Sequence, residues 1–199
     1  MDQSSKILEN WNAFRGACTR LGTRAEPLGR MLDHFEERAP LAPASSRLEY
    51  HAAYPGGLID HSLRVMRNAI ALSKPMGGTK QVPIESLVIA SLFHDWGKVG
   101  SLEEDLYLPQ ESSWHRERGM MYVHNENILF MTNVDRTIWL MQHFGVHLSE
   151  EEFLGIRLND GQYVNENKPY GMKEPTLALI VHTADRIACD EEKGRSSLV

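Results

Sequence analysis

The segment at residues 84–98 has the sequence IESLVIASLFHDWGK. Its apolar residues cover nearly the whole circumference of a helix, which we expect over roughly residues 84–96. A helix that is apolar all round is a buried helix. His94 and Asp95 interrupt it at its end, and Gly97 is expected to cap its C-terminus. The segment therefore predicts a central helix that carries two ionisable side chains at its C-terminal end.

Helical patterns dominate the chain on both sides of this segment. We expect helices over residues 5–20, 25–37, 58–73, 132–145 and 149–160, and a last long helix after Pro175. Proline and glycine crowd residues 39–57, which predicts an ordered loop. Between residues 101 and 127 the helical periodicity fails, and weak alternation at 105–109 and 120–124 predicts a small hairpin or lid. The predicted fold class is all-α with a small β insertion.

Local signals mark several of the expected helix ends. Leu21-Gly22-Thr23 separates the first two helices, and Pro75 with Gly77 and Gly78 is expected to end the 58–73 helix. Residues 149–152, Ser-Glu-Glu-Glu, form a capping box that opens the helix predicted after them.

The overall composition restricts the class of protein. The 199 residues suit one domain, and 42% hydrophobic with 24% charged residues is typical of a folded globular chain. No apolar run is long enough to cross a membrane, and the N-terminal residues predict no signal peptide. Two cysteines suit a reducing compartment, so we expect a cytoplasmic protein. A net charge of −6 argues against stable binding of long nucleic acids through a basic surface.

Four ionisable side chains interrupt the apolar faces of three predicted helices: His61, His94, Asp95 and Asp185. Each alone is more commonly a satisfied core or capping residue than a ligand. Together they are harder to explain in that way, because buried imidazoles and carboxylates are costly unless they are paired or bind a metal. Nitrogen and oxygen ligands of this kind suit Mn, Fe, Co, Ni or Zn. The negative end of the 84–96 helix dipole also favours a cation there.

The order of these residues resembles the H…HD…D signature of the HD-domain metal-dependent phosphohydrolase superfamily. The local contexts are similar as well: YPGGLIDH at residues 54–61, FHDWGK at 93–98 and HTAD at 182–185. The first context is most similar to HD-domain 3′→5′ exoribonucleases and relaxase-associated HD domains. The resemblance covers roughly residues 50–190. It implies an HD-type helical bundle in a single domain over 1–199, with N-terminal helices in 1–45 and the insertion at 101–127.

The resemblance also implies roles for the residues of the signature. It implies that His61, His94, Asp95 and Asp185 are ligands of one divalent metal ion. It further implies that Asp95 can bridge to a second metal where one is present, and that Lys98 neutralises a substrate phosphate. Asp95 and Lys98 are therefore the expected catalytic residues.

The sequence departs from the pattern of two-metal members of the superfamily. Where those members supply extra histidines, this chain carries Asn133 and, before Gly161, Asn159 and Asp160. Neutral asparagine is a poor ligand beside histidine, so we expect one metal ion per chain. His124 and His143 offer a rival placement, although His143 is expected at the surface and His124 in the lid.

The resemblance implies a phosphohydrolase that acts on ester or anhydride bonds, and the acidic composition and small size favour a nucleotide or a short oligonucleotide as its substrate. The expected substrate contacts are Lys98, His124, Asn133, Asp160 and Arg116, the last from an aromatic and basic cluster in the insertion. An HD-type 3′→5′ exoribonuclease is the alternative within hydrolases. Two alternatives belong to other classes of function. A di-iron oxygenase would need the ligands of a second metal, and a non-catalytic binding protein would keep the metal pocket without hydrolysing a substrate.

Overall fold

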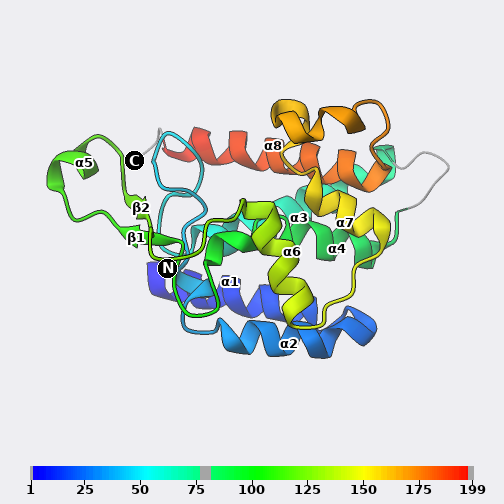
Figure 1. Ribbon diagram of the computed structural model, residues 1–199, viewed down its shortest axis with the longest axis horizontal. Helices are drawn as coiled ribbons and strands as arrows, with labels where there is room; N and C mark the ends of the chain where they lie inside the picture. Colours follow the sequence, from blue (N-terminus) through cyan, green and yellow to red (C-terminus); the bar gives the residue numbers. More distant parts are fainter. Residues whose placement is uncertain (1, 77–81, 197–199) are drawn as a thin grey trace.

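Helices form three layers in the computed structural model, which describes residues 2–76 and 82–196, with side chains up to residue 193. Helices α3 (Gly57–Met76) and α4 (Ile84–Phe93) lie in the middle layer, between α8 (Thr176–Ser196) and the N-terminal helices (Figure 1). The N-terminal layer consists of α1 (Gln3–Cys18) and α2 (Ala25–His34). The most extensive packing joins α3 to α8 and α4 to α3. The all-α prediction is confirmed.

The buried face of α4 anchors the core, as its apolar circumference predicts. Leu87, Ile89 and Phe93 are fully buried or nearly so. Phe93 meets the ring of Phe14 from α1 edge-on at 5.3 Å between centroids, and Trp96 packs on both. Aromatic contacts of this kind therefore join the N-terminal helices directly to the segment that carries His94 and Asp95.

Helix α4 ends earlier than the sequence predicts. It stops at Phe93, and the chain turns through His94 and Asp95 into a 3-10 helix, η3 (Trp96–Val99). The expectation that Gly97 caps the helix is wrong, because Gly97 lies inside η3. A Cβ atom at Gly97 would lie 2.1 Å from the backbone oxygen of Asn133, so glycine is required there by the close approach of α6 (Asn133–His143).

The predicted insertion contains a hairpin, as expected. Strand β1 (Tyr107–Pro109) pairs antiparallel with β2 (Tyr122–His124), with Tyr107 opposite His124. A short helix that the sequence did not predict, α5 (Ser113–Glu117), lies between them and projects away from the helical layers (Figure 1).

The remaining helices begin where capping signals predict. Thr132 caps α6 by accepting a hydrogen bond from the backbone N–H of Asp135 at 3.1 Å. Ser149 and Glu152 form the expected capping box of α7 (Glu150–Arg157), which ends three residues before the predicted end.

The helix expected over 58–73 is longer than predicted. It begins at Gly57 and continues through Pro75 to Met76. Gly77 and Gly78, which were expected to end it, lie outside the described residues. The loop expected over 39–57 contains the 3-10 turn η2 (Ala39–Leu41), and two further turns, η4 (Gly161–Tyr163) and η5 (Asn165–Tyr170), precede α8.

Candidate metal centre

Three helical segments bring the four predicted ligands together. His61 comes from α3, His94 and Asp95 from the turn after α4, and Asp185 from α8. The Nε2 atom of His61 lies 3.0 Å from Oδ1 of Asp185 and 3.3 Å from Nε2 of His94. Oδ2 of Asp95 lies 3.5 Å from Nε2 of His94 and 3.8 Å from Nε2 of His61. The two histidines are fully buried or nearly so.

The hydrogen bonds on the far side of each imidazole fix which nitrogen faces the centre. Nδ1 of His94 lies 2.8 Å from the carbonyl oxygen of Ser91, and Nδ1 of His61 lies 3.1 Å from a carboxylate oxygen of Glu192. Both partners are acceptors, so each Nδ1 carries a proton, and in the neutral imidazole each Nε2 presents a lone pair. Two lone pairs and two carboxylate oxygens therefore converge on one point.

Such a set of acceptors fits a divalent cation. Bonds of about 2.0–2.2 Å to histidine and carboxylate ligands place neighbouring donor atoms roughly 3.0–3.4 Å apart. Most of the measured separations lie close to that range, and His61, His94 and Asp185 form a compact group with donor atoms within 4.8 Å of one another. Neutral imidazole nitrogens and carboxylate oxygens this close repel one another, so a proton or a cation is needed to hold them together.

The pKa values of the four groups indicate the same demand for positive charge. Burial alone lowers the pKa of His61, but hydrogen bonds to Asp185 and Glu192 outweigh it and raise this pKa to about 9. Burial opposes the charge on Asp185, yet the two histidines hold its pKa well below the usual value. A proton or a metal ion bound between these groups stabilises the buried carboxylates.

Asp95 is held from both sides. Nζ of Lys98 lies 2.6 Å from its Oδ2 atom, and the amide nitrogen of Asn133 donates to its Oδ1 atom at 2.7 Å. Burial opposes the charge on Lys98, but Asp95 outweighs it and raises the pKa of Lys98. Lys98 is therefore a charged neighbour of the centre, and Asn133 orients a carboxylate of the centre.

The residues that precede Gly161 support the turn after α4. Asn159 is buried, and its amide nitrogen donates to the carbonyl oxygen of His94 at 2.9 Å. Asp160 lies close enough to the centre for its charges to act on it. Loss of hydration raises the pKa of Asp160, and the negative charges of Asp95 and Asp185 raise it further.

Other predicted site residues lie elsewhere. Arg116 donates to the backbone oxygens of Gln110 and Glu111 at the far end of the insertion. His124 is exposed on β2, with its ring 4.9 Å from that of Tyr107, and His143 is exposed at the end of α6. The structure does not bring these three to the four ligands.

A second layer of charge behind His61 was not predicted. One carboxylate oxygen of Glu192 accepts hydrogen bonds from Nδ1 of His61 at 3.1 Å and from Nε of Arg64 at 3.0 Å. Arg64 also contacts Asp60, which accepts from the hydroxyl of Tyr54 at 2.7 Å. Glu192 follows Asp185 by seven residues and so shares its helix face, which is the signal that could have identified it.

Glu192→Gln is expected to weaken metal binding by roughly 10- to 100-fold, because a neutral amide supports the Nδ1–H of His61 less strongly than a carboxylate does. Competition with a chelator measures the affinity. Glu191→Gln is the matched control, because Glu191 is the exposed neighbour on the same helix. Equal metal affinity in the two variants would contradict this role for Glu192.

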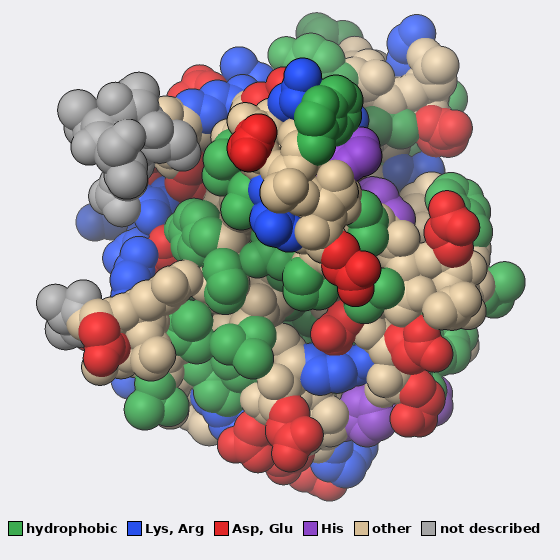
Figure 2. Space-filling model, turned by 90° about the vertical axis from the view of Figure 1, so that its left-hand side faces the viewer, with side chains coloured by type: hydrophobic (Ala, Val, Ile, Leu, Met, Phe, Trp, Pro, Cys, Tyr) green, Lys and Arg blue, Asp and Glu red, His purple; other side chains and the backbone are tan. Residues whose placement is uncertain are grey.

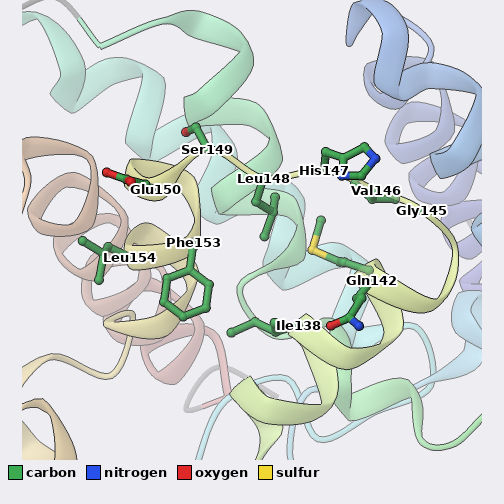
Figure 3. Close-up of a pocket in the computed structure, with 11 residues that line it drawn as sticks. Ile138, Gln142, Gly145, Val146, His147, Leu148, Ser149, Glu150, Phe153 and Leu154 are labelled. Atoms are coloured by element: carbon green, nitrogen blue, oxygen red, sulfur yellow. The ribbon is translucent and has the colours of Figure 1, made fainter.

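Two cavities lie near the helices of the site. One, of about 360 Å³, includes Lys98 in its wall together with Arg38, Tyr107 and Tyr122. The other, of about 560 Å³, lies between α6 and α7, where Ile138, Leu148 and Phe153 face one another (Figure 3). None of the four predicted ligands lines either cavity, but Lys98, whose Nζ atom contacts Asp95 at 2.6 Å, lies in the wall of the first.

Comparison with known proteins agrees with this geometry. The family model for the HD domain matches residues 58–190, which is more than half of the chain and includes all four predicted ligands. The chain therefore belongs to the HD-domain family. The HD domain implies metal-dependent phosphohydrolase activity in the broad sense and the binding of a divalent metal. Neither the curated proteins nor the solved structures gave a match.

Proposed function

Because this chain belongs to the HD-domain family, we propose that it hydrolyses phosphate ester or anhydride bonds of a nucleotide or a short oligonucleotide. The observation that carries the proposal is the convergence of four acceptor atoms from His61, His94, Asp95 and Asp185, with the ammonium group of Lys98 beside them. A divalent cation held by these residues would lower the pKa of a bound water molecule and stabilise developing charge on phosphate oxygens.

Three side chains of the site have further roles in the proposed reaction. Asp95 holds the cation and, through its contact at 2.6 Å, keeps Lys98 at the edge of the centre. Lys98 neutralises a phosphate oxygen of the substrate, for which a compact ammonium charge is suited. Asp160 is assigned the exchange of a proton with the reacting groups, because burial and the charges of Asp95 and Asp185 raise its pKa.

One metal ion per chain is part of the proposal, from among Mn, Fe, Co, Ni or Zn. Asn133 supports it, since its amide N–H occupies the Oδ1 atom of Asp95 that a second cation would need. Asn159 likewise directs its N–H to a backbone carbonyl. This arrangement favours hydrolysis over a di-iron oxygenase reaction, which requires a second set of ligands.

The cavity beside Lys98 supports a nucleotide substrate. Its volume of about 360 Å³ lies in the range of small-molecule sites, and the rings of Tyr107 and Tyr122 offer faces on which a base can stack. On the face seen in Figure 2, basic side chains are scattered among acidic ones and form no continuous stripe. This distribution favours a small substrate over a long nucleic acid or a processive exoribonuclease substrate.

A cytoplasmic location is also proposed, because both cysteines are free, which suits a reducing compartment. The described part of the chain contains no helix that is both long and apolar enough to cross a membrane.

A panel of mononucleotides, dinucleotides and cyclic nucleotides tests the proposal, with phosphate release and product masses followed under several divalent metals. We expect metal-dependent turnover of at least one nucleotide, abolished by a chelator and restored by metal. If short oligonucleotides alone are cut, one residue at a time from the 3′ end, the exoribonuclease alternative is correct. Absence of turnover across the panel would contradict the proposal.

Lys98→Ala is expected to keep its metal ion while KM rises or kcat falls by roughly 10- to 100-fold, because a charge-assisted contact to the phosphate is lost. Steady-state kinetics and metal analysis of the same sample measure both effects. Lys74→Ala, at an exposed position near the end of α3, controls for the loss of a positive charge. Unchanged kinetics would show that Lys98 serves only as the partner of Asp95.

A further inference from the structure

His51 lies beside the metal centre but is not one of the predicted ligands. Its ring is 4.5 Å from the ring of His61 between centroids, with 35° between the ring planes. It is also close enough to Lys98, Asp95 and Asp185 for their charges to act on it. His51, from the loop before α3, therefore lies next to the predicted metal ligands.

The Nε2 atom of His51 is buried and has no hydrogen-bond partner among the described residues. An unsatisfied buried polar atom destabilises a folded protein, and such atoms are uncommon. A molecule that binds at the centre can supply the missing partner. The atom is thus placed to gain a hydrogen bond when the substrate is bound.

The backbone around His51 is held in an unfavourable conformation. Ala52 has a φ of 46°, in the left-handed region that a non-glycine residue rarely adopts. The hydroxyl of Ser45 donates to the carbonyl oxygen of His51 at 2.6 Å, and the backbone N–H of Ala44 donates to that of Ala52 at 3.1 Å. A Cβ atom at Gly57 would lie 2.0 Å from the backbone oxygen of Ala52, so the start of α3 packs tightly against the backbone that follows His51. These contacts fix the imidazole of His51 against His61.

A ring nitrogen of His51 lies within 4.8 Å of one of His61 and of Sγ of Cys189, and these three residues form a group that shares only His61 with the group of His61, His94 and Asp185. The buried Nε2 atom of His51, which has no partner among the described residues, is the ring nitrogen that a molecule bound at the centre can contact.

We propose that His51 is a further catalytic residue, whose Nε2 atom hydrogen-bonds a phosphate oxygen of the substrate at the metal centre. The inference rests on the proposed function, because it requires that a phosphate group binds there. A fully ionised phosphate oxygen only accepts hydrogen bonds, so His51 carries its proton on Nε2 when the phosphate is bound.

Binding of inorganic phosphate to the Co²⁺-loaded full chain tests this role without any turnover. The visible spectrum of the cobalt reports binding, and metal analysis reports the cobalt content. His51→Phe keeps a ring that packs against His61 but removes both nitrogens, and His51→Gln restores an N–H donor. His143→Phe, at an exposed position on α6, is the matched control.

We expect the cobalt content of His51→Phe to equal that of the wild-type chain and its dissociation constant for phosphate to rise by roughly 10- to 100-fold. His51→Gln should recover part of this loss, and the control should bind as the wild type does. His51→Ala removes the same nitrogens with a smaller side chain and decides the matter if the Phe variant does not fold.

Two results would overturn the role of His51 alone: wild-type phosphate affinity in the Phe or Ala variant, or loss of cobalt, which would make His51 a metal ligand. If phosphate does not change the spectrum of the wild-type protein, the proposed function and the role of His51 are both wrong.

Discussion

Asp185→Ala is expected to retain no divalent metal after dialysis and to lose hydrolytic activity by about 10³-fold or more. The substitution removes the carboxylate whose Oδ1 atom lies 3.0 Å from Nε2 of His61 and 3.7 Å from Nε2 of His94. Without it Asp95 is the one carboxylate left among the four predicted ligands, and Lys98 neutralises its charge, so little negative charge draws a cation between the imidazoles. A loss of this size corresponds to the several kcal/mol that a metal ion supplies to the transition state.

Metal analysis and activity of the same preparation measure both effects, and circular dichroism checks that the helices remain. Asp190→Ala is the matched control, because Asp190 is exposed on the same helix and pairs only loosely with Arg186 at 3.6 Å. His94→Ala should reproduce the result from the other side of the centre. Full metal content in both His94→Ala and Asp185→Ala would show that these residues are not the ligands.

Gly97→Ala is expected to destabilise the fold by about 3 kcal/mol, which is at the upper end of the usual cost of overpacking. The new Cβ atom would lie 2.1 Å from the backbone oxygen of Asn133 and 2.9 Å from its Oδ1 atom. To relieve this clash, α6 must move away from η3. Such a movement weakens the hydrogen bond of Asn133 to Asp95 as well, so metal affinity should fall together with stability.

Urea denaturation measures the free energy of unfolding, with Gly29→Ala as the control. Gly29 lies inside α2, and a Cβ atom there meets nothing within 4 Å. Its replacement by alanine should raise stability by roughly 0.5–1 kcal/mol, because glycine is the poorer helix former. If Gly97→Ala were as stable as the wild type, the close packing of α6 on η3 would be wrong.

Much of the fold is predictable from periodicity. The apolar circumference of residues 84–93 predicts a buried helix, and the Ser149–Glu152 pattern predicts the start of α7. The end of α4 is not predictable in this way, because contacts from distant parts of the chain decide it. The amide of Asn159 donates a hydrogen bond to the carbonyl oxygen of His94, and the hydroxyl of Thr137 accepts one from the backbone N–H of Gly97. Because both partners lie far away along the chain, the sequence around His94 and Gly97 predicts neither contact.

In the candidate site, too, the sequence predicts some residues and only the structure identifies the others. His61, His94, Asp95 and Asp185 interrupt apolar helix faces, so the pattern identifies them, and the structure brings them together. Glu192 lies on the same face of α8 as Asp185, but an acidic residue near the end of a long helix is usually exposed. His51 lies in a loop, where no periodicity links it to the helices. Only the folded chain reveals its ring beside that of His61.

Hydrolysis in ¹⁸O-labelled water, with oxygen excluded, tests the central claim most directly. The wild-type protein, loaded with Mn²⁺ or Co²⁺, is given a nucleotide that it turns over, and the phosphate or phosphomonoester product is weighed by mass spectrometry. A metal-dependent phosphohydrolase predicts one labelled oxygen from water for each bond cleaved, at a rate that does not depend on dioxygen. Turnover that stops when dioxygen is removed, or a product without the label, would contradict the account.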